Sequence, residues 1–121
     1  MAYEYGRGAE MLLARRYLGL ERGEMATVLR VREQSYQRWE NGRDAIPDGA
    51  WKDVDALYAR FDQQVEALIA AVPPTGEDPH PVRVWRGRSP EQPFPGLWQR
   101  IVGEARRREP RITPVYPDDD E

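Results

Sequence analysis

The feature that most constrains this chain is an apolar stripe in residues 51–72. Its members recur at alternating steps of three and four, the repeat of one face of a helix: Trp51, Val54, Tyr58, Phe61, Val65, Leu68 and Val72, widened by Leu57 and Ile69. Pro47-Asp48 precedes the stripe and Pro73-Pro74 follows it, so we predict one helix of about 24 residues capped by Asp48. A small three-helix domain covers only its first half. The second half needs another partner, either the C-terminal segment or a second subunit.

Shorter helices are predicted ahead of this one. The first spans about Ala9–Leu18 and ends at Gly19, and the second spans about Arg22–Leu29. A turn at residues 30–32 follows. The candidate core residues of these two helices are Met11, Leu12, Tyr17, Leu18, Met25, Ala26, Val28 and Leu29.

Residues 32–42 form a third amphipathic segment, with the sequence Arg-Glu-Gln-Ser-Tyr-Gln-Arg-Trp-Glu-Asn-Gly. Tyr36 and Trp39 are three residues apart and can face a core, and Gly42 is a natural left-handed stop. The opposite face carries amides and a guanidinium. Because Gln can pair bidentately with adenine and Arg with guanine in a major groove, this face suits the reading of base edges.

The C-terminal part is divided by its prolines and glycines. Residues 73–81 form a linker, a short strand is predicted at 82–85, an amphipathic helix at 96–108, and a second strand at 111–116 that Pro114 restricts to a sheet edge. This part is too small for a core of its own, so we expect it to pack on the long helix and to support dimerisation. The predicted organisation is therefore a DNA-binding domain at 1–72, a linker at 73–81, a dimerisation segment at 82–117 and an acidic tail at 118–121.

Composition excludes several classes of chemistry. The chain has no cysteine, which rules out disulfides, thiolate catalysis and zinc fingers. Its one histidine, His80, lies between two prolines, where a solvated role is more common than metal binding. No Ser/His/Asp set or Gly-rich phosphate loop is present, so we expect no enzyme, no cofactor and no metal. No signal peptide or membrane-spanning run is visible, and we expect a cytoplasmic protein.

The net charge of −3 is unevenly distributed. Residues 1–43 carry eight Arg against six acids, a net +2, and residues 82–117 carry eight Arg against three acids, a net +5. Residues 44–81 carry two basic residues against eight acids, a net −6, and the tail adds −4. Binding to nucleic acid depends on the local patch, so the acidic balance weakens that function without removing it.

Three motifs, in this order and spacing, resemble the Cro/C1-type (XRE) helix-turn-helix family of phage and bacterial regulators over about residues 9–60. They are Leu18-Gly-Leu20, Glu24-Met-Ala-Thr-Val-Leu and Ser35-x-x-Arg-Trp-Glu-Asn-Gly42. A narrower likeness is to the anti-CRISPR-associated (Aca) autorepressors and related proteins with the YdiL-type domain. Those pair a Trp-Glu-x-Gly-Arg-x-x-x-Pro stretch, here residues 39–47, with a small C-terminal strand–helix segment. The resemblance implies a mainly α fold: a helix-turn-helix bundle with a long fourth helix and a C-terminal strand–helix–strand dimerisation segment.

The resemblance also implies roles for individual residues. The base-reading positions would be Arg32, Glu33, Gln34, Gln37 and Arg38. Arg22, at the start of the second helix, would contact a phosphate, and Asn41 and Arg43 would contact the next ones. Arg15 and Glu40 match a buried ion pair that ties the first helix to the third.

This chain departs from the family pattern at two positions. The turn between the second and third helices usually carries Gly where this chain has Arg30, which implies a left-handed arginine or a reshaped turn. Glu33 at a groove-facing position would repel phosphates. It either accepts a hydrogen bond from cytosine or is an exposed acid favoured by the helix dipole, and we favour the second role.

The Arg106–Arg108 cluster is most simply interpreted as solvated charge.

The leading functional hypothesis is a sequence-specific DNA-binding repressor. One recognition helix reads only a few base pairs, so we expect a homodimer on an inverted repeat of double-stranded DNA, and the resemblance suggests an autorepressor. The alternative is the antitoxin of a toxin–antitoxin pair, in which residues 82–121 would bind a toxin protein. The same basic face could also hold an RNA hairpin.

Overall fold

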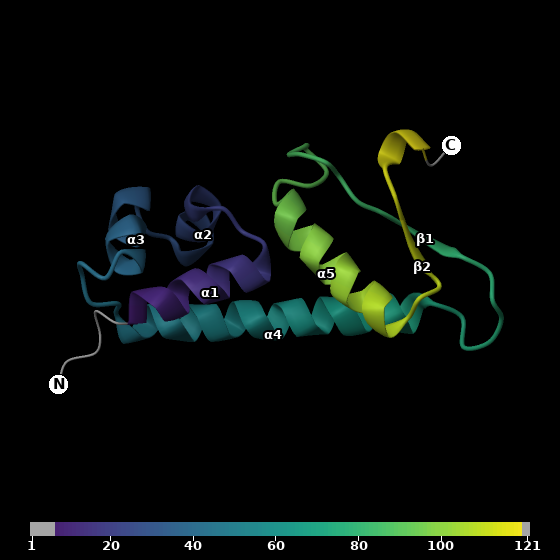
Figure 1. The fold of residues 1–121 in the computed structure, drawn as a ribbon, viewed down its shortest axis with the longest axis horizontal. Coiled ribbons are helices and arrows are strands. Elements are labelled where there is room, and N and C mark those ends of the chain that lie inside the picture. Colours follow the sequence, from purple (N-terminus) through teal and green to yellow (C-terminus); the bar gives the residue numbers. More distant parts are fainter. Residues whose placement is uncertain (1–6, 120–121) are drawn as a thin grey trace. The chain divides into compact units, whose positions relative to one another are not determined.

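The computed structural model describes residues 7–119, so the last two residues of the predicted acidic tail lie outside it. The described residues form five α-helices and two strands: α1 (Gly8–Leu18), α2 (Arg22–Leu29), α3 (Glu33–Glu40), α4 (Asp48–Ala71), β1 (His80–Arg83), α5 (Pro95–Arg108) and β2 (Ile112–Val115), followed by the 3-10 helix Pro117–Asp119 (Figure 1). The prediction of a mainly helical fold is confirmed. The contacts divide the chain into a first unit that ends at Tyr58 and a second that begins at Ala59, and α4 contributes residues to both.

The first three helices all end on a left-handed residue: Gly19 (φ 73°), Arg30 (φ 61°) and Gly42 (φ 77°). After α2, the Arg30 N–H donates to the Thr27 carbonyl at 3.1 Å and the Val31 N–H donates to the Ala26 carbonyl at 3.0 Å. This pair of bonds is the Schellman motif, and α1 and α3 close with the equivalent pairs. The left-handed arginine is thus confirmed, at a cost of about 1–2 kcal/mol relative to a right-handed residue.

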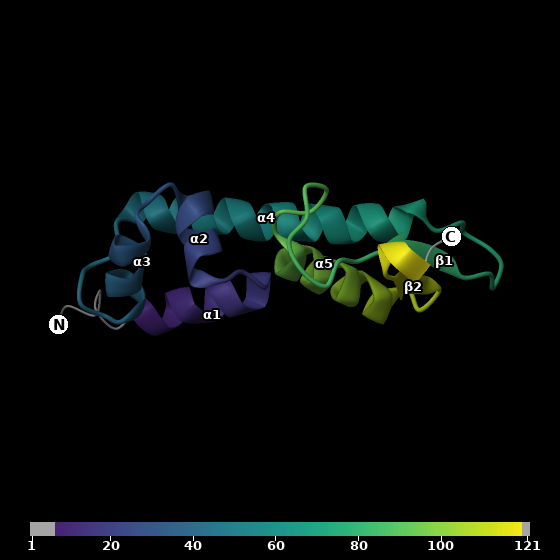
Figure 2. The same ribbon diagram turned by 90° about the horizontal axis from the view of Figure 1, so that it is seen from above.

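The core of the first unit is made by the apolar sides of its helices, and Figure 2 shows α1, α2 and α3 gathered against the beginning of α4. Met11, Leu18, Met25 and Tyr36 are fully buried in it. The prediction that Tyr17 belongs to this core is wrong. Its position lies on the flank of the buried stripe of α1, and it is 38% exposed. Its ring packs edge-to-face against Tyr58 of α4, with the centroids 5.5 Å apart.

The predicted stripe of α4 is the buried face of that helix. Val54, Phe61 and Val65 are buried, as is Val72 directly after the helix, and the remaining apolar positions of the stripe are half-buried. Asp48 is the first residue of the helix rather than its cap. The cap prediction is therefore wrong by one position, although an acid in the first turn is still favoured by the helix dipole.

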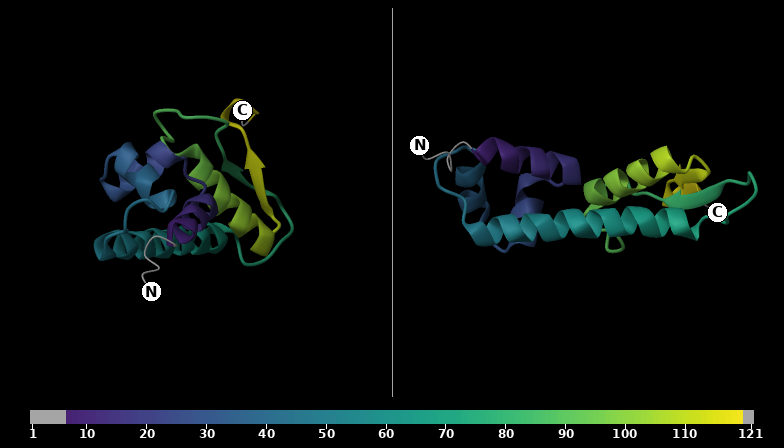
Figure 3. Two further views of the ribbon diagram at one scale, coloured as in Figure 1. Left: turned by 60° about the vertical axis from the view of Figure 1, so that its left-hand side comes forward. Right: turned by 90° about the horizontal axis from the view of Figure 1, so that it is seen from below.

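In the second unit, α5 is inclined to the second half of α4 (Figures 1 and 3). Its buried side chains, with those of α4 and β2, form the core of this unit: Phe61, Val65, Ile101, Val102, Ala105 and Ile112. The strands pair in parallel, from His80 opposite Ile112 to Arg83 opposite Val115. The first strand was predicted at residues 82–85, but β1 begins at His80, which the prediction had placed in the linker. The bounds of β1 are set by its pairing with β2.

Both outer edges of this sheet carry a proline. The His80 N–H donates to the Arg111 carbonyl and the Val84 N–H to the Val115 carbonyl, so alternate residues of β1 face β2. The same parity leaves Pro81 of β1 and Pro114 of β2 with their backbones turned outward. Since proline has no N–H, each edge lacks a donor that a further strand would need.

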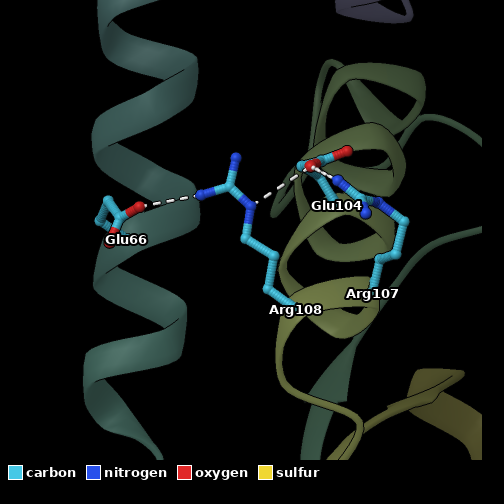
Figure 4. Close-up of polar contacts among 4 residues, drawn as sticks. All are labelled: Glu66, Glu104, Arg107 and Arg108. Carbon is cyan, nitrogen blue, oxygen red and sulfur yellow. Dashed lines mark hydrogen bonds and ion pairs between the residues drawn. The ribbon is translucent and has the colours of Figure 1, made fainter.

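The arginine cluster at the end of α5 is paired rather than simply solvated. Arg107 pairs with Glu104 at 2.7 Å, and Arg108 pairs with Glu104 at 3.3 Å and with Glu66 of α4 at 2.9 Å (Figure 4). Arg106 donates to the carbonyl of Ile112 at 2.8 Å. These contacts tie α5 to α4 and to β2.

None of the helices in the described part of the chain is both long and apolar enough to cross a membrane.

Candidate nucleic-acid interface

The candidate interface is built on α2, the turn after it, and α3. At the start of α2, Glu21 and Glu24 form a capping box, in which the Glu24 carboxylate accepts from the Glu21 N–H at 2.8 Å. Glu24, Met25 and Ala26 are buried, which holds α2 against its neighbours. The left-handed Arg30 then turns the chain at once into α3, and α2 and α3 contact each other.

The inner face of α3 is anchored by two aromatic rings. Tyr36 is fully buried and Trp39 is 8% exposed, and their rings meet edge-to-face with centroids 6.2 Å apart. Both residues therefore serve packing.

A buried ion pair fastens α3 to α1. The Arg15 Nε donates to Glu40 Oε2 at 2.8 Å and the Arg15 Nη2 donates to Oε1 at 3.0 Å, while Nη1 donates to the Leu20 carbonyl at 3.1 Å. The side chains are only 10% and 9% exposed. This is the pair that the family resemblance implied. It fixes the end of α3 on the body of the first unit.

The Tyr36 hydroxyl is buried beside this pair. It makes no hydrogen bond of regular geometry with a described residue, yet it is close enough to Glu40 and Arg15 to interact with both. Burial, together with the Glu40 carboxylate, raises the pKa of Tyr36 well above its ordinary value. Burial also disfavours the charged form of Glu40, but Arg15 and the Tyr36 hydroxyl outweigh this and hold the pKa of Glu40 below its usual range. The Glu40 carboxylate is therefore ionised at neutral pH.

The start of α1 also approaches α3 closely. A Cβ added at Gly8 would lie 2.6 Å from the carbonyl oxygens of both Trp39 and Glu40. Only glycine fits there without a shift of backbone, so this contact adds a second constraint on the position of α3.

The outer face of α3 remains open. The predicted base-reading residues are accessible to solvent. Four are exposed, namely Arg32, Glu33, Gln34 and Arg38, and Gln37 is half-buried. The Glu33 carboxylate lies over the first turn of α2, where its Oε1 would be 3.1 Å from a Cβ at Gly23. Glu33 is also the first residue of α3, where the dipole of that helix favours an acid, and its contact with a base stays a prediction.

The predicted phosphate contacts lie at the ends of these helices. Arg22 is the first residue of α2, Asn41 is the C-cap of α3 and Arg43 follows it, and all three are exposed. The Arg22 charge is near enough to Glu40 to lower the pKa of that carboxyl. Arg30 and Arg32, in and after the turn, are exposed as well. Four exposed arginines therefore lie at or next to the ends of α2 and α3: Arg22, Arg30, Arg32 and Arg43.

The sequence reasoning missed one contact of this surface. Arg38 pairs with Asp44, with Nε 2.7 Å from Oδ2 and Nη2 3.2 Å from Oδ1. Hydrogen bonding and charge from each partner lower the pKa of Asp44 and raise that of Arg38. The signal was an acid placed just after a left-handed glycine stop, since a Schellman motif brings the following residues back beside the last turn of the helix.

The second unit has an open pocket of about 630 Å³. Its walls are mainly apolar, from Val84, Val102, Val115 and Tyr116, and Arg86 and Arg106 also line it. The Arg86 guanidinium stacks on the Tyr116 ring at 3.5 Å.

Within residues 7–119, no group of acidic and histidine side chains is arranged to hold a metal ion.

Comparisons of the chain with models of protein families, with curated proteins and with solved structures found no match.

Proposed function

We propose that the protein is a sequence-specific DNA-binding repressor of the helix-turn-helix type, in which α3 is the recognition helix. The observation that carries this proposal is the division of α3 into two faces. Its inner face is fixed by Tyr36, Trp39 and the Arg15–Glu40 pair. Its outer face presents Gln34 and Arg38 to solvent.

The chemistry of the outer face favours double-stranded DNA over a merely solvated surface. Gln34 matches the N6 and N7 groups of adenine, and Arg38 matches the O6 and N7 acceptors of guanine. The exposed Arg22, Asn41 and Arg43 at the helix ends supply donors for phosphate, which would set the position of α3 in the groove. Each copy of the protein would thus read a few base pairs through α3.

We propose further that the protein binds as a homodimer through its second unit. Two half-sites of an inverted repeat lie about 34–36 Å apart, and a symmetric dimer supplies two recognition helices. The outward-facing Pro81 and Pro114 oppose dimerisation by strand addition. The open apolar pocket beside α5 supports an interface made by side-chain packing instead.

DNA selection with the purified protein tests the proposal directly. We expect an inverted repeat with half-sites one helical turn apart. Gln34→Ala or Arg38→Ala should lower affinity for the selected operator by about 5-fold to 150-fold, with binding to unrelated DNA nearly unchanged. Arg22→Ala should weaken binding to all DNA similarly and reduce the slope of the salt dependence by about one.

Arg16→Ala is the matched control, because Arg16 is an exposed arginine of α1 that belongs to neither predicted contact set. It should leave operator binding unchanged. A selection that returns no motif, or operator binding that survives loss of both Gln34 and Arg38, would refute the assignment of this face.

The antitoxin hypothesis differs in what the second unit binds. That unit has its own buried side chains on α4, α5 and β2, which favours an interface between copies over a disordered segment that folds on a toxin. Size-exclusion chromatography with light scattering separates the two. A stable homodimer supports the repressor, whereas a monomer that co-purifies with another protein through residues 82–121 supports the antitoxin.

A further inference from the structure

Asp44 makes two kinds of contact with one residue, Arg38. Its carboxylate accepts from the guanidinium through two parallel bonds, Nε to Oδ2 at 2.7 Å and Nη2 to Oδ1 at 3.2 Å. Its backbone N–H donates to the carbonyl of the same Arg38 at 3.2 Å. Arg38 is therefore held at both its main chain and the tip of its side chain.

The end of α3 places Asp44 for this purpose. Gly42 is left-handed, and the Arg43 N–H also donates to the Arg38 carbonyl, at 2.8 Å. These bonds return the chain to the last turn of α3, so the carboxylate of Asp44 is positioned by backbone geometry rather than by a free loop. The two side chains remain 57% and 43% exposed, and an exposed pair of this kind contributes little to stability.

The paired geometry leaves a defined part of the guanidinium available. Arginine has five N–H donors, and the carboxylate takes one from Nε and one from Nη2. Of the three N–H groups that remain, one on Nη1 and one on Nη2 point in the same direction. These form the edge of the guanidinium that matches the two acceptors of guanine in the major groove.

We propose that Asp44 is a positioning residue for base reading, which holds the Nη1–Nη2 edge of Arg38 toward one guanine and so determines specificity at that base pair. This inference rests on the proposed function. Asp44 would then have two opposite effects on binding. Its negative charge repels the phosphates of DNA and lowers affinity, whereas its contact with Arg38 increases specificity.

The opposed effects give Asp44→Asn a distinctive signature. The loss of a negative charge should raise affinity for unrelated DNA. The amide of asparagine offers Arg38 one acceptor in place of two and carries no charge, so the bidentate pair is lost. The Arg38 side chain should then be freer, so that the preference for guanine at its position falls by about 5-fold, the lower end of the discrimination given by a good bidentate pair. The base preference at the position read by Gln34 should be unchanged, which general damage to α3 would not allow.

The experiment is DNA selection, followed by titration of the selected operator and of its single-base variants. Wild type, Asp44→Asn, Arg38→Ala and the double variant are compared. In the Arg38→Ala background, Asp44→Asn should cause no further loss of guanine preference. Asp53→Asn, which removes an exposed acid of α4 in the same unit, controls for net charge and should leave the base preferences unchanged.

The outcomes separate the two proposals. If wild type selects no DNA motif, the proposed function itself fails. If wild type selects a motif and Asp44→Asn keeps the full guanine preference, or loses preference equally at every position, the positioning role of Asp44 is overturned and the proposed function stands.

Discussion

Replacement of Glu40 by glutamine would leave the Arg15 guanidinium buried without its counter-ion. In the native protein both side chains are about nine-tenths buried, and the carboxylate accepts two hydrogen bonds from Arg15 at 2.8 and 3.0 Å. The amide of glutamine offers one acceptor and no charge. The cost of the change is therefore dominated by an uncompensated buried cation.

The expected loss is about 3–5 kcal/mol of unfolding free energy, the range for removing one partner of a buried pair. A small domain has about 5–15 kcal/mol in total, so the first unit should be severely destabilised. Replacing both partners with apolar residues, as in Arg15→Met with Glu40→Leu, should recover part of this loss. Recovery should be incomplete, because the Leu20 carbonyl loses the hydrogen bond that Arg15 Nη1 donates.

Urea denaturation followed by circular dichroism measures the loss, and amide hydrogen exchange in α1 and α3 assigns it to the first unit. Glu10→Gln is the matched control, since Glu10 pairs with Arg7 in an exposed position and should contribute less than about 0.5 kcal/mol. A loss below about 1 kcal/mol in Glu40→Gln would refute the reasoning. It would mean that water reaches the Arg15 guanidinium and screens it.

The same pair predicts a dependence on pH. Burial opposes ionisation of Glu40, but Arg15 and Tyr36 prevail and depress its pKa in the folded state. Its contribution to stability is therefore fully present above the pKa of an unfolded glutamate, about 4.3, and is lost as the pH falls through the lower folded value. Glu40→Gln should lack this component of acid unfolding, and stability curves of the two proteins that remain parallel below pH 4 would contradict the assignment.

Three other positions give direct tests. Arg30→Gly should raise the unfolding free energy by up to about 1 kcal/mol, because glycine relieves the left-handed strain; a lower melting temperature would count against this account. Gly8→Ala should cost about 1–3 kcal/mol in the same measurement, since its Cβ would meet two carbonyl oxygens of α3 at 2.6 Å, and a neutral effect would show that α1 can shift freely. In an NMR titration Glu109 should show a pKa of about 2, because the Arg111 side chain and N–H both bond its carboxylate. Arg111→Gln should return that pKa toward about 4.3, and an unchanged value would rule out the pair as the cause.

Local patterns in the chain were enough to predict most of the helices. The spacing of apolar residues from Trp51 to Val72 predicted α4 within one residue at each end, because a helix repeats its buried face every three or four positions. Gly19 and Gly42 marked helix ends for an equally local reason, since a left-handed residue costs glycine almost nothing. The outer face of α3 was visible from the same periodicity.

The missed features depend on residues that are distant in the sequence or on the path of the backbone. The start of β1 at His80 follows from its parallel register with β2, which no pattern within residues 80–85 contains. The exposure of Tyr17, despite its contact with Tyr58 of α4, depends on how the segments of the first unit pack around α1. The Arg38–Asp44 pair depends on the return of the chain after Gly42.

By itself, the sequence determined which segments are helical, where they stop and which polar side chains share the outer face of α3, because these properties depend on neighbours within a few residues. The tertiary structure decided which side-chain groups of α3 are accessible to a binding partner. It buries Tyr36 and Trp39, joins Glu40 to Arg15, turns Glu33 over α2 and binds one edge of Arg38 to Asp44. Each of these outcomes follows from packing and hydrogen bonding between segments, whose geometry exists only once the chain has folded.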